Sequence, residues 1–226
     1  MPNLQRVDDV FILDLGDGEN RFSLEWMDGV LAAFDEVDAA EGPRALVTTA
    51  SGKIWSNGLD LDWLLANPDA ASSYIDKVQA VFARPLTCTA PTVAALQGHT
   101  FAGGGLLALA HDRRMMRADR GFFCLPEVDL GIPFAGGMSL LVQAKLTPNT
   151  AVEAMLTGRR YGGTDAQAAG IVSDALSEAD LLPTAIAAAA ELAAKAGPTL
   201  QTIRKTMYRP ILDLLVKPAN LDIPGL

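Results

Sequence analysis

The stretch of this sequence best suited to chemistry runs from Gln97 to Asp112 and contains three consecutive glycines at 103–105. An apolar run at 92–96 precedes it, and the glycines lead into a helix-like Leu-Leu-Ala-Leu-Ala. The first turn of a helix has backbone N–H groups without internal partners, and the helix dipole adds positive potential there. Because glycines let another molecule approach that backbone closely, the stretch predicts a site that stabilises negative charge developing on a carbonyl oxygen.

Glycines alone leave a second interpretation open, since a tight strand-to-helix turn or two closely packed helices would also need them. The spacing is not that of the dinucleotide-binding fingerprint G-x-G-x-x-G, and no Lys-Ser/Thr pair of a phosphate-binding loop follows. His99 and His111 flank the glycines without forming a Ser-His-Asp arrangement, so packing or capping is the expected role of each.

The composition limits which partners the chain can have. Its 226 residues are 50% hydrophobic and 20% charged, which suffices for one sizeable core. A net charge of −9 and a pI near 4.6 argue against general binding to nucleic acid or membrane surfaces. Positive charge for a small anionic ligand must therefore be local.

Targeting signals and cysteines point to the compartment. No apolar run approaches the ~20 residues that span a bilayer, and no N-terminal signal pattern occurs. The last four residues, Ile-Pro-Gly-Leu, differ from the peroxisomal address Ser-Lys-Leu. Cys88 and Cys124 lie in apolar contexts without metal-ligand spacing and are predicted to be buried thiols. We expect a cytoplasmic protein without a membrane span, a disulfide or a metal site.

The first hundred residues have a pattern typical of alternating strands and helices. Residues 7–15 alternate like a strand, a helix is expected from the cap Ser23 to about residue 40, and 44–50 suit a strand buried on both faces. Strand, helix and strand in this order predict a parallel crossover. A loop at 51–58, a short helix with Asp60 in its first turn, and a helix at 71–84 ended by Pro85 follow.

The second half continues this pattern and closes with helices. The expected strands are at 113–118, 121–125 and 171–172, the expected helices at 138–146, 149–156, 179–196 and 198–216, and a second glycine-rich loop at 126–137. Because the composition shifts at Gly197-Pro198, we predict a core of residues 1–196 and a C-terminal helical region of residues 197–226.

Three sequence blocks occur in the order and spacing of the crotonase superfamily, the enoyl-CoA hydratase/isomerase group. Trp-Ser-Asn-Gly-Leu-Asp-Leu at 55–61 is similar to F-S-A-G-x-D-L. Ala-Ala-Leu-Gln-Gly at 94–98 leads through the glycines to His-Asp at 111–112, and Pro-Glu-Val-Asp-Leu-Gly-Ile-Pro occupies 126–133. With Leu-Thr-Gly at 156–158, the likeness covers roughly residues 7–210. Variants such as Leu-Ala-His-Asp and Glu-Val-Asp-Leu-Gly resemble the Δ3,Δ2-enoyl-CoA isomerase branch, notably its plant-type members.

The resemblance implies an α/β fold, a crotonase-like spiral of ββα units with a C-terminal helical region, that assembles as a homotrimer or dimer of trimers. It implies an acyl-CoA thioester as the substrate, in fatty-acid oxidation or a related pathway. It implies no cofactor, because CoA is part of the substrate.

Carried over residue by residue, the resemblance assigns the two backbone N–H donors of an oxyanion hole to Leu59 and Gly104. Both residues lie at loop-to-helix starts, where free N–H groups point outward. They would hold the thioester oxygen as it becomes an enolate, and each such donor typically contributes ~2.7–4 kcal/mol.

The acid–base positions of the family separate its activities. Hydratases use two glutamates, and the matching positions here are Leu107 and Glu127; certain isomerases use an acid at the position of Ala135. Only Glu127 remains, which fits an isomerase that removes a C2 proton and returns it at C4 with one carboxylate. A solvated loop carboxylate is the alternative. Asp129 is expected to point away, and desolvation by apolar neighbours to raise the pKa of Glu127. These neighbours are Leu107, Leu125, Val128 and Phe134.

Binding residues follow from the same resemblance. CoA is expected at Lys53, Ile54, Trp55, Ser56, Gly58 and Lys205, with 54–58 contributing backbone around the adenine. The acyl chain is expected against Trp63, Phe101, Leu107 and Phe134, although Trp63 and Phe101 could equally be core residues. Arg204 is expected to be an ordinary solvated charge.

Two other functions stay open. One is hydration of 2-enoyl-CoA, or another reaction through a thioester enolate, which would require activity despite Leu107. The other is a catalytically silent acyl-CoA-binding subunit, against which the retained Glu127 argues.

Overall fold

The structure is a computed structural model that describes residues 1–217. The four C-terminal residues discussed above, and the end of the predicted region 197–226, lie outside the described residues.

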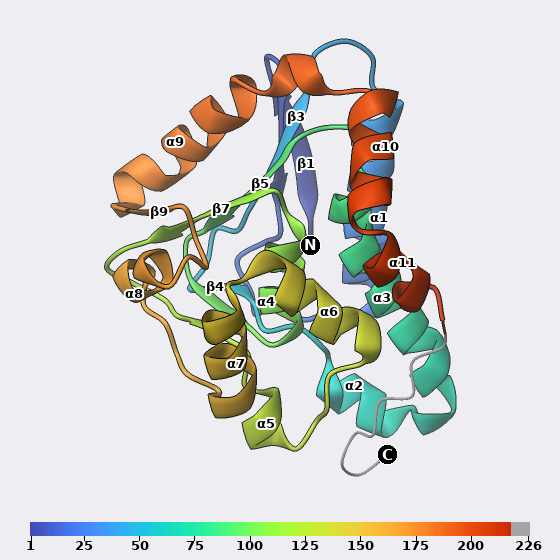
Figure 1. Ribbon diagram of the computed structural model, residues 1–226. Helices are drawn as coiled ribbons and strands as arrows, with labels where there is room; N and C mark the ends of the chain where they lie inside the picture. The colour runs from blue at the N-terminus through green and yellow to red at the C-terminus, as the bar shows by residue number, and fades with distance from the viewer. Residues whose placement is uncertain (218–226) are drawn as a thin grey trace.

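Six strands form the larger of two sheets, in the order β1-β2-β3-β5-β7-β9 (Figure 1). β1 pairs antiparallel with β2, and the other pairs of this sheet are parallel. The bounds are β1 (Asn3–Val7), β2 (Val10–Asp14), β3 (Ala45–Thr49), β5 (Thr92–Leu96), β7 (Arg113–Arg117) and β9 (Asp174–Leu176). The parallel crossover predicted for the first strand, helix and strand is confirmed by the pairing of β2 with β3.

A smaller parallel sheet lies beyond the ends of these strands and consists of β4 (Ile54–Ser56), β6 (His99–Phe101) and β8 (Phe123–Cys124). Three turns of the chain therefore place one strand in the large sheet and one in the small sheet before a helix begins, whereas β1 and β2 both belong to the large sheet. β3 and β4 precede α2 (Leu61–Ala66), β5 and β6 precede α4 (Gly103–Ala110), and β7 and β8 precede α5 (Glu127–Leu130). The predicted spiral of ββα units is confirmed.

Helices cover both faces of the large sheet. Alternate residues of β2 show the two sides: Phe11 and Leu13 belong to the core shared with α1, α3 and α4, whereas Val10 and Ile12 pack with α9. Most of the core lies on the first side. The helices before the C-terminal pair are completed by α1 (Leu24–Ala39), α3 (Ala71–Thr87), α6 (Gly136–Lys145), α7 (Pro148–Thr157), α8 (Gly163–Ala168) and α9 (Glu178–Ala190).

The C-terminal helices α10 (Pro198–Met207) and α11 (Arg209–Leu215) pack on α3 and α6 of their own chain (Figure 1). Arg204 of α10 is 3% exposed, donates to the carbonyls of Cys88 and Ala90, and pairs with Asp112. The prediction that Arg204 is a solvated charge is therefore wrong: the loop after α3 leaves carbonyls unpaired, and this guanidinium satisfies them.

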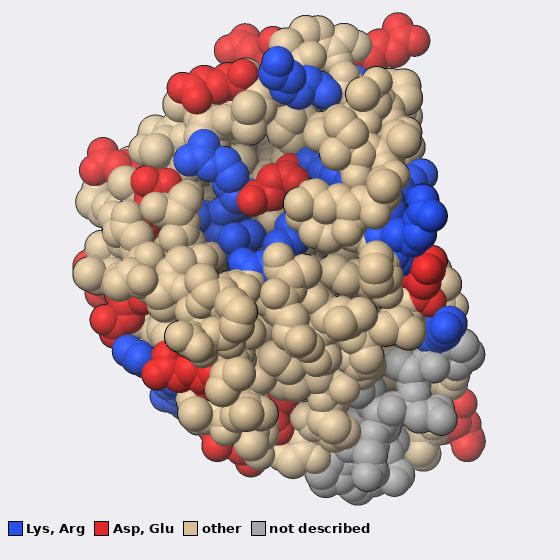
Figure 2. Space-filling view, viewed as in Figure 1, with Lys and Arg blue, Asp and Glu red and all other residues tan. Residues whose placement is uncertain are grey.

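Other basic residues also lie close to the C-terminal helices. Figure 2 shows Lys and Arg side chains gathered around a hollow between α9 and α10. Lys145, at the end of α6, donates to the carbonyl of His111 and lies 4.5 Å from the ring centroid of Tyr208. Burial lowers the pKa of Lys145 to about 8.

Local patterns misplaced some elements in the first half of the chain. The strand expected at 7–15 is half of a hairpin that turns at Asp8, a residue with a φ of 52°. Pro85 lies inside α3 rather than ending it, because a missing N–H near a helix end removes only one hydrogen bond. β4 and β6 were not expected, since three residues are too few to show alternation.

The differences in the second half have similar causes. The glycine-rich loop expected at 126–137 contains α5, a single helical turn. The last strand lies at 174–176 instead of 171–172, α8 was not expected, and the helix expected at 198–216 is interrupted at Tyr208. Short elements of this kind depend on tertiary contacts that a local pattern does not contain.

Two predictions made for the whole chain concern membrane-spanning helices and the state of the cysteines. Over residues 1–217 no helix combines the length and apolar character that crossing a membrane needs. Cys88 and Cys124 are free and buried, as predicted.

Candidate active site

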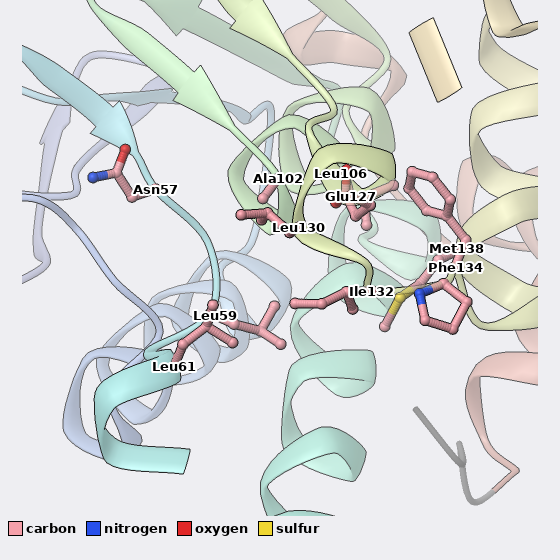
Figure 3. A pocket seen from close by; sticks show the side chains of 12 residues that line it. Asn57, Leu59, Leu61, Ala102, Leu106, Glu127, Leu130, Ile132, Phe134 and Met138 are labelled. Atoms are coloured by element: carbon pink, nitrogen blue, oxygen red, sulfur yellow. The ribbon is translucent and has the colours of Figure 1, made fainter. Parts of the chain in front are cut away.

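An apolar cavity of about 70 Å³ lies where three segments of the spiral meet (Figure 3). They are the loop from β4 to α2, the start of α4, and the segment from α5 to α6. The side chains that line the cavity are those of Asn57, Leu59, Leu61, Ala102, Leu106, Glu127, Leu130, Ile132, Pro133, Phe134 and Met138, together with Gly103. Among the described residues, Glu127 is the only titratable one in this inner cavity.

Glu127 is the first residue of α5 and is 7% exposed. Its Oε2 atom is buried and has no hydrogen-bond partner within residues 1–217. Burial raises the pKa of Glu127 to about 7, although a hydrogen bond to its own backbone opposes the shift. The expectation of a solvated loop carboxylate is thus excluded, and the expected rise in pKa is confirmed.

The environment of Glu127 differs in part from the expected one. Phe134 lines the cavity, but Val128 is 49% exposed, and Leu107 on α4 is 1% exposed and packs in the core. Leu106 takes the cavity-facing position on α4, one turn after Gly103. Asp129 points away as predicted, because it is exposed and its carboxylate lies beside Gly158.

Two loops meet closely at the mouth of the cavity. Gly58 has a φ of +77°, and a Cβ atom placed there would lie 2.5 Å from the amide nitrogen of Gly103. A Cβ atom at Gly104 would collide with the carbonyl oxygen of Ser56. The hydroxyl of Ser56 accepts a hydrogen bond from the N–H of Gly58 and donates one to the carbonyl of Asn20, which fixes this loop.

The backbone N–H groups of Leu59 and Gly104 flank this contact. Gly104 lies in the first turn of α4, where the helix itself supplies no acceptor. Neither N–H donates a hydrogen bond to another group within the described part of the chain. Leu59 lines both cavities, whereas Gly104 follows the lining residue Gly103 in the chain.

Ala102 joins the small sheet to α4 in a strained conformation. Its φ is 50° and its ψ is −125°, a combination that normally favours glycine. Its N–H donates to the carbonyl of Cys124, and its carbonyl accepts from the N–H of Leu106. These bonds hold the methyl side chain of Ala102 against the cavity. Ala102 was not predicted as a site residue from the sequence.

A larger basin of about 470 Å³ opens outside the inner cavity. The inner cavity and the outer basin meet at a neck, which we define by the five residues that line both: Asn57, Leu59, Leu61, Ala102 and Leu130. Lys53, Ile54, His99 and Phe101 line only the outer basin. The pKa of His99 is lowered by burial and by the positive charges of Lys53, Arg160 and Arg120.

The other residues predicted from sequence are distributed unevenly. Trp55 and Ser56 are fully buried, so only their backbone can meet a ligand. Trp63 stacks on Tyr74 with centroids 5.3 Å apart and lines neither cavity, and neither does Lys205, which is exposed on α10.

His111, Asp60 and Asp112 have structural roles. His111 is fully buried and bonds with the carbonyl of Leu107 and the hydroxyl of Thr48, which confirms a packing role. Asp60 caps α2 by accepting from the N–H of Trp63, and Asp112 pairs with Arg204.

Besides Ala102, the lining residues that were not predicted from the sequence include Leu61, Leu106, Ile132 and Met138. Helical spacing from Gly103 could have indicated Leu106. The other three come from α2, the loop after α5, and α6, and no local signal shows that these segments meet.

Comparisons with known proteins fit this fold and site. Residues 10–223 match the family model described as enoyl-CoA hydratase/isomerase. The chain is 35% identical over 228 residues to the peroxisomal enoyl-CoA delta isomerase 2 of Arabidopsis thaliana, covering 95% of each chain. It is 34% identical over 231 residues to enoyl-CoA delta isomerase 3 of the same plant, covering 97% of each.

A solved structure supports the fold. An enoyl-CoA hydratase/isomerase family protein from Pseudomonas syringae superposes with a TM-score of 0.86 at 24% identity, over 95% of this chain and 93% of that one. The protein therefore belongs to the enoyl-CoA hydratase/isomerase family and has its crotonase-like fold. The predicted resemblance to plant-type isomerases is confirmed.

Proposed function

We propose that this protein is a Δ3,Δ2-enoyl-CoA isomerase in which Glu127 carries the proton in both directions. The observation that carries the proposal is a single titratable side chain, buried and with a raised pKa, in an otherwise apolar cavity. A base with a pKa near 7 is suited to proton transfer at neutral pH, because it is substantially ionised yet still basic.

The proposed reaction has two proton transfers. Ionised Glu127 removes a proton from C2 of a 3-enoyl thioester, and the electron pair moves into the thioester carbonyl to give a dienolate. The protonated carboxyl then donates the same proton to C4, the double bond comes to lie between C2 and C3, and the carbonyl is restored. The unpartnered Oε2 atom supports this role, since it is not held by another group.

The dienolate oxygen is proposed to bind the N–H groups of Leu59 and Gly104. Their lack of internal acceptors supports the assignment. The close approach of the loop at Gly58 to the start of α4 keeps the two donors in one rigid arrangement, so they need little reorganisation as charge develops.

The residues that line the inner cavity suit isomerisation better than hydration. Hydration must activate water and protonate C2 together, which is difficult with one carboxylate. The position of the second hydratase glutamate is Leu107, which is buried in the core. The apolar lining gives a water molecule few polar partners.

The outer basin is proposed to hold CoA. Lys53 and Phe101 line it, as do Ile54 and Asn57 from the segment expected around the adenine. We assign the acyl chain to the inner cavity against Phe134. Lys205 lines neither cavity and is left out of the proposed CoA site.

Assembly and compartment complete the proposal. We propose a homotrimer or dimer of trimers, supported by the exposed apolar side chains of Val152 and Leu156 on α7, which are 58% and 67% exposed. Light scattering would measure the mass. We propose the cytoplasm as the compartment, with two free thiols as support, and imaging of the tagged protein in its own cell as the test.

A paired assay tests the activity. Purified protein is mixed with 3-hexenoyl-CoA, and separately with 2-hexenoyl-CoA, while the absorbance of the conjugated enoyl thioester is followed. We expect absorbance to rise with the 3-enoyl substrate and to stay constant with the 2-enoyl substrate. A fall with the 2-enoyl substrate would identify a hydratase, and no change in either assay with CoA thioester still bound would identify a silent subunit.

A further inference from the structure

We infer that the inner cavity restricts the substrate to short acyl chains, about four to six carbons long, and that Met138 with Phe134 sets this limit. The inference rests on the proposed function for the nature of the ligand, an acyl-CoA thioester. It adds the length of the acyl group and the residues that select it.

The small volume of the inner cavity limits the length of the acyl chain. A cavity of about 150 Å³ holds one benzene ring, so the inner cavity, at about 70 Å³, has room for about three carbon atoms. With the thioester carbonyl held at the neck by Leu59 and Gly104, C2 lies beside Glu127. C3, C4 and C5 then fill the remaining space, which sets the limit at about four to six carbons.

Packing behind Phe134 and Met138, which form the far wall of the cavity, keeps this wall in place. Figure 3 shows Phe134 and Met138 on the side of the cavity opposite Asn57. Met138 is 4% exposed and belongs to α6, which packs on α11. A Cβ atom at the preceding Gly137 would lie 3.2 Å from the backbone nitrogen of Leu215. The start of α6 therefore cannot retreat, and a longer chain must displace a packed side chain.

A different path for a long chain would pass between α5 and α6. Leu130 is 47% exposed and Pro133 is also exposed, so this wall is thinner than the one formed by Met138. A chain that left the cavity here would continue to gain affinity with each added carbon. That behaviour is the opposite of what the inference predicts.

The test measures calorimetric binding of CoA and of butyryl-, hexanoyl-, octanoyl- and decanoyl-CoA to the full chain. In an open tunnel each buried methylene would tighten binding about fourfold. We expect binding to tighten from butyryl- to hexanoyl-CoA and then to stay level or weaken. A steady increase through decanoyl-CoA would overturn the inference.

Variants identify the wall. Met138→Ala removes three heavy atoms beyond Cβ and should tighten decanoyl-CoA relative to hexanoyl-CoA by about tenfold. Met207→Ala is the matched control, because Met207 is 68% exposed on α10, and it should keep the wild-type profile. If Met138→Ala does not fold, Phe134→Leu shortens the same wall at a partly buried position. A folded variant of either kind with the wild-type profile would also overturn the inference.

Saturated thioesters separate this inference from the proposed function, because they contain no double bond to move. A level profile beyond hexanoyl-CoA without turnover of 3-hexenoyl-CoA would reject the isomerase and keep the short-chain cavity. Turnover together with a rising profile would keep the isomerase and reject the short-chain cavity.

Discussion

The buried carboxyl of Glu127 couples activity to pH. If it is the base, it must be ionised in the free enzyme, and burial raises its pKa to about 7. We expect kcat/KM for 3-hexenoyl-CoA to rise about tenfold per pH unit below pH 7 and to level off above it. A profile already flat from pH 5 upward would assign the proton transfer to a group with an ordinary carboxyl pKa.

Replacing this carboxyl tests the single-base mechanism. Glu127→Gln keeps the shape of the side chain but cannot accept the proton, so isomerisation should fall by about 10²–10⁴-fold. Asp129→Asn is the matched control, because Asp129 is an exposed acid on the same helix. It should retain activity within about twofold. Equal losses in both variants would point to damage to α5.

Glu127→Gln should lower the activity but raise the stability of the protein at pH 8. The folded-state pKa of Glu127 is raised to about 7, above about 4.3 in the unfolded chain. The folded state therefore binds more protons between these values, and the free energy of unfolding falls as pH rises through that window. Glu127→Gln does not titrate, so the variant should match the wild type near pH 4 and be more stable by on the order of 3 kcal/mol at pH 8.

Thermal unfolding measures this difference. For a chain of this size the gain corresponds to a rise in Tm of about 5–10 °C at pH 8. A variant that loses activity but gains no stability at pH 8 would show that the buried carboxylate is compensated by a partner.

At the scale of elements, the contact between β4 and α4 positions both proposed N–H donors. Gly104→Ala would force the start of α4 away from Ser56, because its Cβ collides with a backbone carbonyl. We expect a loss of activity of at least about 10²-fold and a destabilisation of about 1–3 kcal/mol. Gly162→Ala is the control, since a Cβ there has no neighbour within 4 Å, and both properties should stay near wild type.

Element-level patterns explain which parts of the site were predictable. Ser23 was readable as a helix cap because capping is local, and the cap is observed. The glycines at 103–105 were found from their position before a helix start, and Glu127 through a family resemblance. Met138 and Leu61 were not found, because they reach the cavity only through the packing of α6 and α2 in the complete spiral. The strain at Ala102 was likewise invisible, since alanine carries no signal for positive φ.

The docking of α10 depends on one buried guanidinium. Arg204→Met keeps an apolar stem but removes the donor to the carbonyls of Cys88 and Ala90 and the ion pair of Asp112. We expect a destabilisation of about 3–5 kcal/mol in urea unfolding. Lys205→Met, its exposed neighbour on the same helix, should change the free energy of unfolding by less than about 0.5 kcal/mol. Similar values for the two variants would show that Arg204 is not needed to hold α10.

At the scale of the whole molecule, the structure bears on whether residues 197–226 form a separate region. Within the described residues, α11 packs on α6, the helix that carries Met138, and Arg204 binds the loop between α3 and β5. The area between the C-terminal helices and the spiral is therefore part of the core that closes the cavity. We expect α10 and the spiral to unfold together.

Two probes can report on these parts separately. Trp26, Trp55 and Trp63 all lie within residues 1–196, so tryptophan fluorescence follows the spiral. A dye on Lys205→Cys follows α10, and the native thiols at Cys88 and Cys124 are buried and should react slowly while the protein is folded. Coincident urea midpoints would show one cooperative unit. If the dye signal changes at a lower urea concentration, the C-terminal helices form a separate unit, and the wall behind Met138 opens before the fold is lost.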